Sequence, residues 1–276
     1  MTETKRPEIG STVVANGIKT NYLEDGKGTP VVFVHGSGPG VTAYANWRLV
    51  MPGLAPHYRT LAPDMVGFGY TDRPAGVTYN VQTWADQTIG FMDALDIQTA
   101  SVVGNSFGGG IALRMATQHP ERIDKLVLMG SMGVSFPITD GLDRVWGYQP
   151  SVENMRQMLH LFAYSAELAN DDQLARVRYE ASIQPGFQEA FSSMFPSPRQ
   201  DSVDAMAIPE KELRKVDKQT LLVHGRDDQI IPVDTSLRLL QLIDRSQLHV
   251  FGRCGHWTQL ERAADFTRLV DDFLSR

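Results

Sequence analysis

The stretch Ala100-Ser-Val-Val-Gly-Asn-Ser-Phe-Gly-Gly-Gly110 joins a short apolar run to a single serine and a series of glycines. The run at 100–103 predicts a buried strand, and the residues after it predict a sharp turn into a helix. Gly104 and Gly108 stand two residues before and two after Ser106, which is the G-x-S-x-G spacing. Small residues there let strand and helix approach closely while the serine takes a strained backbone conformation. The stretch therefore predicts one hydroxyl group presented above the edge of a sheet.

Strand and helix patterns alternate on both sides of this turn. An Asn16-Gly17 turn predicts a hairpin at 12–22, and short apolar runs predict buried strands at 30–34, 59–62, 125–129, 220–224 and 247–251. Helical spacing of apolar residues is found at 81–95, 108–119, 235–243 and 266–273. Repeated strand–helix units indicate an α/β fold with a mostly parallel central sheet and helices on both of its faces.

Between residues 134 and 207 the pattern changes to amphipathic segments near 152–161 and 171–183, with several prolines and no convincing strand. We interpret this region as an inserted helical lid. The core domain would then consist of residues 1–133 and 208–276.

Composition narrows the possible partners of the 276-residue chain. A formal net charge of −6 argues against nucleic acid, and an anionic small molecule would need specific local cations. No apolar run approaches the roughly 20 residues of a membrane span, so we expect no membrane partner. The polar start, residues 1–8, has no secretion signal, so we expect a cytoplasmic protein. Cys254 is the one cysteine and no Cys/His spacing suggests a metal, so we expect neither metal nor cofactor.

Two further segments complete a catalytic constellation with Ser106. Asp228 follows the predicted strand at 220–224, and His256 follows the one at 247–251. Serine, acid and histidine in this chain order, each after a strand, fit a nucleophile, an orienting carboxylate and a general base. Asp227 is a rival for the acid, and we favour Asp228 because of its place before Gln229-Ile-Ile-Pro232. Each residue taken alone could be structural. Backbone N–H groups of Phe107 and Ser37 would form the oxyanion hole.

These motifs resemble the meta-cleavage product hydrolases, the α/β-hydrolases that cut carbon–carbon bonds in bacterial aromatic degradation. The resemblance covers nearly the whole chain. It rests on His35-Gly-Ser-Gly-Pro-Gly-Val-Thr-Ala43, Asn46-Trp-Arg48, Gly104-Asn-Ser-Phe-Gly-Gly109, Val145-Trp-Gly-Tyr148, Arg178-Tyr-Glu-Ala-Ser-Ile183 and Cys254-Gly-His-Trp-Thr258. Asn105 beside the serine and Trp257 beside the histidine separate this group from general esterases.

The resemblance implies hydrolysis of the C5–C6 bond of a 2-hydroxy-6-oxohexa-2,4-dienoate by a homo-oligomer. It also implies that Arg178, Asn46, Asn105 and Trp257 hold the carboxylate and the 2-oxygen of the substrate, and an arginine fork suits a carboxylate. Without the resemblance, Arg178 would be read as a solvated charge on a lid helix. A small-ester carboxylesterase and a non-catalytic small-molecule receptor remain alternatives, whereas haloalkane dehalogenation is disfavoured because it uses a carboxylate nucleophile where this chain has Ser106.

Overall fold

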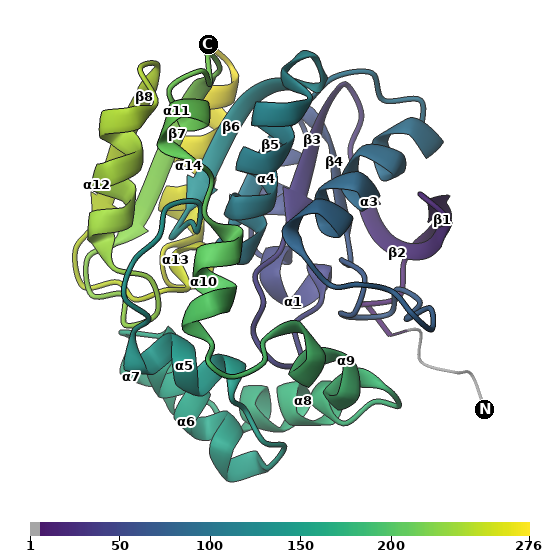
Figure 1. The fold of residues 1–276 in the computed structure, drawn as a ribbon, viewed down its shortest axis with the longest axis vertical. Coiled ribbons are helices and arrows are strands. Elements are labelled where there is room, and N and C mark those ends of the chain that lie inside the picture. The colour runs from purple at the N-terminus through teal and green to yellow at the C-terminus, as the bar shows by residue number, and fades with distance from the viewer. Residues whose placement is uncertain (1–5) are drawn as a thin grey trace.

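The computed structural model describes residues 6–276, which form an 8-stranded sheet between layers of helices (Figure 1). The first five residues of the polar stretch 1–8 lie outside the described part. The spatial order of the strands is β1 (Ser11–Ala15), β2 (Ile18–Asp25), β4 (Tyr58–Pro63), β3 (Thr29–Val34), β5 (Ala100–Asn105), β6 (Ile123–Met129), β7 (Gln219–Gly225) and β8 (Ser246–Phe251). Only the pairs β1–β2 and β2–β4 are antiparallel, which confirms the predicted mostly parallel sheet.

The hairpin formed by β1 and β2 follows from its turn residues. Asn16 and Gly17 have positive φ angles of 48° and 79°, and Ala15 pairs directly with Ile18. Two consecutive positive φ angles give the turn whose twist matches the twist of paired strands. The sequence prediction for 12–22 is confirmed.

Helices cover both faces of the sheet because its central strands are apolar on both sides. Val31 and Phe33 point into a core shared with α1 (Ala43–Trp47), α2 (Met51–Leu54) and α14 (Ala263–Leu274). Val32 and Val34 point into the opposite core, with α3 (Val81–Ala94), α4 (Phe107–Gln118) and α12 (Val233–Leu242). Alternate residues of one strand therefore anchor different helix layers, as the pleat of a strand requires.

The chain between β6 and β7 is helical throughout its regular elements. Its helices are α5 (Asp140–Trp146), α6 (Val152–Phe162), α7 (Ala166–Ala169), α8 (Asp172–Ser182), α9 (Phe187–Met194), α10 (Gln200–Met206) and α11 (Glu210–Leu213). In Figure 1, α5 to α9 form a separate layer below the ends of the strands. Side-chain caps fix where three of these helices begin: Thr139, Ser151 and Asp171 accept from the N–H groups of Leu142, Asn154 and Leu174, respectively.

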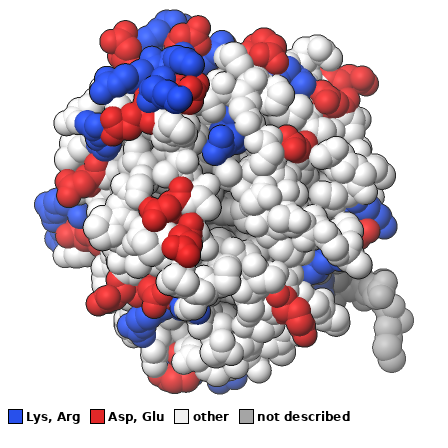
Figure 2. All heavy atoms as spheres, viewed as in Figure 1, with Lys and Arg blue, Asp and Glu red and all other residues white. Residues whose placement is uncertain are grey.

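Five short helices outside residues 134–207 are not predicted from the sequence: α1, α2, α11, the 3₁₀ helix Pro120–Arg122 and α13 (Thr258–Glu261), which follows His256 and Trp257. All five are shorter than the window in which helical spacing can be read. No helix within residues 6–276 has the length and apolar character needed to cross a membrane. On the face drawn in Figure 2, positive and negative side chains are interspersed near the C-terminus, where ion pairs such as Arg238–Glu210 and Arg276–Asp272 form.

Candidate active site

Ser106 occupies the turn between β5 and α4 with a φ angle of 55° and a ψ angle of −114°. Its N–H donates to the Met129 carbonyl over 2.8 Å, and its carbonyl accepts from the Met132 N–H over 3.1 Å. A Cβ atom added to Gly104 would lie 2.5 Å from the Gly108 carbonyl oxygen, and one on Gly108 would lie 2.2 Å from the Val34 carbonyl oxygen. The close approach predicted for these two glycines is confirmed. The surrounding backbone holds Ser106 in a conformation that a free chain rarely adopts.

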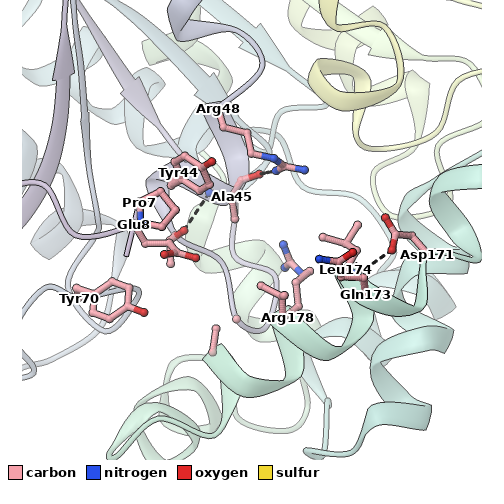
Figure 3. Close-up of a pocket in the computed structure, with 14 residues that line it drawn as sticks. Pro7, Glu8, Tyr44, Ala45, Arg48, Tyr70, Asp171, Gln173, Leu174 and Arg178 are labelled. Atoms are coloured by element: carbon pink, nitrogen blue, oxygen red, sulfur yellow. Dashed lines mark hydrogen bonds between the residues drawn. The ribbon is translucent and has the colours of Figure 1, made fainter. Parts of the chain in front are cut away.

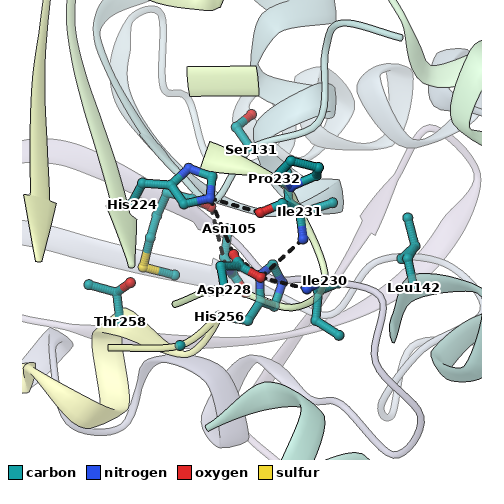
Figure 4. A network of polar contacts seen from close by, with 12 residues as sticks. Asn105, Ser131, Leu142, His224, Asp228, Ile230, Ile231, Pro232, His256 and Thr258 are labelled. Atoms are coloured by element: carbon teal, nitrogen blue, oxygen red, sulfur yellow. Dashed lines mark hydrogen bonds and ion pairs between the residues drawn. The ribbon is translucent and has the colours of Figure 1, made fainter. Parts of the chain in front are cut away.

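His256 and Asp228 form a buried pair at the ends of β8 and β7 (Figure 4). The His256 Nδ1 atom lies 2.7 Å from Oδ2 of Asp228, and both side chains are almost fully buried. A carboxylate only accepts, so Nδ1 carries the proton and Nε2 is left free to take one. Asp227 instead accepts from the Cys254 N–H over 3.3 Å. Asp228 is therefore the carboxylate that contacts the histidine, in agreement with the preference from sequence.

Asp228 is held in place by more than His256. Its Oδ1 accepts from the backbone N–H groups of Ile230 and Ile231 over 2.7 and 3.0 Å. The Nε2 atom of buried His224 lies 3.0 Å from the Ile231 carbonyl and 3.4 Å from Oδ2 of Asp228. Since both of those neighbours are acceptors, Nε2 of His224 carries the proton.

These contacts control the charge of Asp228. Burial alone would raise the pKa of its carboxyl group, but attraction to His256 and hydrogen bonds from His224 and His256 outweigh burial and lower the pKa below its usual value. Asp228 therefore stays ionised at neutral pH and can stabilise a positive charge on His256.

Two backbone N–H groups beside Ser106 are available to a ligand. The N–H of Phe107, at the start of α4, and the N–H of Ser37 donate to no acceptor within the described residues. The Ser37 hydroxyl accepts from Nε1 of Trp146 over 2.9 Å. This bond joins α5 to the loop after β3. It gives the Ser37 hydroxyl a partner outside its own turn.

A cavity beside these groups brings together residues from seven distant parts of the chain. Seven of the nine predicted site residues line it: Ser37, Asn46, Asn105, Ser106, Arg178, His256 and Trp257. Phe107 and Asp228 lie behind it, through the turn of Ser106 and the ring of His256. Its apolar walls are contributed by Val41, Leu142, Val145, Phe162 and Ile230.

Arg178 is the one Lys or Arg among the described residues that line this cavity, and it is 5% exposed. Its guanidinium donates to the Pro39 carbonyl over 2.7 Å and lies 5.0 Å from the centre of the Trp257 ring, while its Nε has no partner. No carboxylate within residues 6–276 forms an ion pair with it. Burial and the nearby charge of Arg48 lower the pKa of Arg178 to about 10, so it stays charged at neutral pH.

The glycine-rich loop after β3 is shaped by Arg178. A Cβ atom on Gly40 would lie 2.2 Å from the Arg178 carbonyl oxygen, and one on Gly38 would lie 3.1 Å from its guanidinium. Gly38 and Gly40 therefore allow Arg178 to approach the loop closely, which distinguishes them from the phosphate-binding glycines of other proteins.

The two asparagines have unequal contacts. Oδ1 of Asn46 accepts from the Gly36 N–H over 3.4 Å, and its buried Nδ2 has no partner in the described part of the chain. Nδ2 of Asn105 has only a long contact of 3.5 Å with the Met129 carbonyl. A buried amide N–H group without a good acceptor is costly. The Nδ2 groups of Asn46 and Asn105 are therefore suited to donate to an oxygen atom of a ligand.

Sequence reasoning missed three residues that support this cavity. His35 is fully buried; its Nε2 accepts from the Met65 N–H, and its Nδ1 lies 2.7 Å from the Gly36 carbonyl oxygen. Burial lowers the pKa of His35 to about 4, so its ring stays neutral at neutral pH. Phe162 stacks on Trp257, with ring centres 4.5 Å apart. Glu261 accepts from the Tyr164 N–H, just beyond α6, and from the Gly255 N–H, next to His256. A supporting role for His35 could have been inferred from the sequence, because His35 directly follows a predicted strand. No local pattern marks Phe162 or Glu261.

A parallel sheet whose strand–turn–helix unit carries a strained serine, next to a buried histidine–carboxylate pair, is the arrangement of the α/β-hydrolases. Residues 29–263 match the family described as alpha/beta hydrolase fold. The chain is 59% identical to 2-hydroxymuconate semialdehyde hydrolase of Pseudomonas sp. (strain CF600), covering 98% of this chain and 95% of that protein. It is 58% identical to 2-hydroxy-6-oxo-2,4-heptadienoate hydrolase of Pseudomonas putida (strain F1), over 97% of each.

A solved structure gives the same result. A meta-cleavage product hydrolase from Pseudomonas fluorescens IP01, a serine-to-alanine variant in complex with acetates, matches with a TM-score of 0.96 and 56% identity over 98% of this chain and 99% of that one. The chain thus belongs to the alpha/beta hydrolase family and, within it, to the meta-cleavage product hydrolases, which hydrolyse carbon–carbon bonds.

Proposed function

We propose that this protein hydrolyses the C5–C6 bond of a 2-hydroxy-6-oxohexa-2,4-dienoate, either 2-hydroxymuconic semialdehyde or a 6-alkyl analogue. Arg178 carries this proposal, because a buried guanidinium that no carboxylate of the described chain neutralises lines the same cavity as Ser106 and His256. A buried charge without a partner is costly, and a substrate carboxylate would supply the partner. A simple ester would leave Arg178 unpaired.

Binding at the carboxylate end would prepare carbon as a leaving group. Arg178 holds the carboxylate, and the amide groups of Asn46 and Asn105 with the Trp257 indole donate to the 2-oxygen. Polarising that oxygen favours transfer of the enol proton to C5, which gives the keto form. When the C5–C6 bond then breaks, its electron pair is delocalised through the 2-keto system toward the bound oxygen, so the departing fragment is a dienolate.

The acyl end would use Ser106 and its neighbours. Nε2 of His256 takes the hydroxyl proton as Ser106 attacks the C6 carbonyl, while Asp228 stabilises the resulting imidazolium. The N–H groups of Phe107 and Ser37 donate to the oxyanion. The dienolate takes a proton and leaves as 2-hydroxypenta-2,4-dienoate; water, deprotonated by His256, then releases the short carboxylic acid from Ser106.

The deciding experiment is a direct assay of purified protein. We expect it to bleach the yellow dienol and to release one equivalent of the short acid, with a kcat/KM well above that for small nitrophenyl esters. Good ester cleavage with no bleaching would favour a carboxylesterase. Tight binding of the dienol without turnover would favour a receptor.

We further propose that residues 134–207 act as a lid over residues 1–133 and 208–276. Leu142, Val145, Phe162 and Arg178, all from that segment, line the cavity and support this division. Because the apolar end is walled by Leu142, Val145 and Ile230, we expect kcat/KM to fall from a hydrogen or methyl group on C6 to a phenyl group. Rates on the hydrogen, methyl, isopropyl and phenyl substrates measure this directly.

The resemblance to the family also leads us to propose a homo-oligomer. The edge strand β8, in which Gln247, His249 and Val250 are exposed, offers an unpaired backbone edge on the described chain. Light scattering at several protein concentrations would give the mass, and a monomer at all of them would contradict this.

A further inference from the structure

A second, larger pocket of about 370 Å³ adjoins the candidate active site at Arg178 (Figure 3). The segment 38–46 separates the two spaces: Gly38, Val41 and Asn46 line the inner cavity, and Gly40, Thr42 and Ala45 line the outer pocket. Arg178 lines both. It therefore stands at the boundary between the outer pocket and the reacting groups.

Arg48 is a second cation in the outer pocket. Figure 3 shows the side chains of Arg48, from the end of α1, and Arg178, from α8, directed toward the same space from opposite sides. Arg48 donates to the Ala45 carbonyl over 2.6 Å and forms no ion pair with a carboxylate of residues 6–276. The two charges are close enough for Arg48 to lower the pKa of Arg178. Like charges held this near each other attract an anion into the space between them.

The other walls suit a flat conjugated acid. Tyr44, Tyr70, Leu174 and Val177 provide aromatic and apolar surface. Two carboxylates, Glu8 and Asp171, also lie at the pocket; Asp171 already caps α8 through the Leu174 N–H, and neither pairs with Arg48 or Arg178. An anion with an extended apolar body would thus find its charge directed toward the two arginines.

We propose that the outer pocket is the entrance of the active site, and that Arg48 holds the carboxylate of the incoming dienoate before it passes to Arg178. This rests on the function proposed above. Arg48 would act on capture and leave the chemical steps to the inner cavity, because it does not line that cavity. Charges at the rim of a binding site change the association rate and its dependence on salt more than the chemistry that follows.

The test compares Arg48→Gln, Arg48→Lys and the wild type on the dienoate at several salt concentrations. We expect Arg48→Gln to lower kcat/KM roughly 3- to 10-fold at low salt, to change kcat less than twofold and to flatten the salt dependence. Arg48→Lys should keep most of kcat/KM because it keeps the charge. Arg276→Gln is the matched control, since it removes one exposed arginine at the C-terminus, which lies at the far end of the molecule from α8 in Figure 1.

Two further measurements exclude general damage. A neutral nitrophenyl ester should lose less than twofold in kcat/KM in Arg48→Gln, whereas Val177→Trp, at an exposed rim position, should slow both substrates by narrowing the entrance. Three results would contradict the role of Arg48 at the entrance. They are unchanged dienoate kinetics in Arg48→Gln, an equal loss of kcat/KM on both substrates, and an effect no larger than that of Arg276→Gln. A wild type that does not turn over the dienoate would overturn the proposed function instead, so the two failures are distinguishable.

Discussion

At the scale of single residues, Arg178 distinguishes a carbon–carbon hydrolase from a general esterase. Its guanidinium is buried, bonded once to the Pro39 carbonyl and stacked near Trp257. We expect Arg178→Gln to weaken dienoate binding by about 2–5 kcal/mol, which is at least about 30-fold in Kd, because the substrate carboxylate loses its charged partner. The measurement is an equilibrium titration followed by the absorbance of the dienol.

Arg178→Lys separates charge from geometry in the same titration. Lysine restores the charge but lacks the planar fork, so we expect binding between that of the wild type and that of Arg178→Gln. Cleavage of a neutral ester should change little in either variant. Wild-type affinity in Arg178→Gln would return Arg178 to a structural role.

Ser106 makes a second prediction at this scale. In Ser106→Ala we expect kcat to fall by about 10³-fold or more, because the nucleophile is gone. The dienoate should still bind, since the contacts at its carboxylate end come from other residues. Stopped-flow absorbance would separate binding from cleavage, and turnover within tenfold of the wild type would show that Ser106 is not the nucleophile.

At the scale of elements, Glu261 joins the end of α6 to the loop of the candidate base. One carboxylate oxygen accepts from the N–H groups of Tyr164 and Ser165 over 2.9 and 2.7 Å, and the other accepts from the Gly255 N–H over 2.7 Å. The His256 N–H also donates to the Phe162 carbonyl over 2.8 Å. The backbone that carries His256 is therefore held by an inserted helix as well as by the sheet.

Glu261→Gln should disturb this connection. An amide nitrogen cannot accept, so at least one of these N–H groups loses its partner; we expect a loss of about 1–3 kcal/mol in unfolding free energy and a lower kcat. Urea unfolding and dienoate kinetics would measure both. Glu153→Gln, an exposed change on α6, is the control and should behave as the wild type. Equal stability of the two variants would contradict the role assigned to Glu261.

The same contacts show what local sequence could predict. Some elements depend mainly on residues that are close together in the chain. The strand predicted from the apolar run 30–34 and the turn predicted around Ser106 are of this kind, and the structure contains both. The bond from Trp146 to Ser37 and the contact of Phe162 with Trp257 join residues about a hundred positions apart. No periodicity records such pairs, because tertiary packing decides them. Asp228 could be favoured over Asp227 from sequence, but its contact with His224 could not be predicted.

At the scale of the whole molecule, Asp64 connects parts of the chain that surround the entrance. The fully buried carboxylate accepts from the N–H of Ala43 in α1, the N–H of Tyr70 and the side-chain amide of Asn21 in β2. Burial raises its pKa from 3.8 to about 6, although these three hydrogen bonds oppose the increase. Ionising Asp64 thus costs more in the folded protein than in the unfolded chain.

The sign of the resulting pH dependence follows from linkage. A carboxyl group with a raised folded-state pKa contributes stability that is complete below about pH 4 and is lost as the pH rises through about 6. Since each pKa unit corresponds to about 1.4 kcal/mol, the loss is about 3 kcal/mol. The lowered pKa of Asp228 acts in the opposite direction, because its stability is lost as the pH falls.

Asp64→Asn separates the two carboxylates. Asparagine does not titrate, and Asp228 is present in both proteins, so its contribution cancels in their difference. We expect the unfolding free energy of the wild type minus that of Asp64→Asn to decrease by about 3 kcal/mol between pH 4 and pH 7. The variant should be the less stable protein at pH 4, because its amide nitrogen cannot accept from Tyr70 or Asn21. Urea unfolding at each pH measures the difference, with the exposed change Asp217→Asn as control. A difference that stays constant or grows with pH would show that Asp64 is ionised without cost in the folded protein.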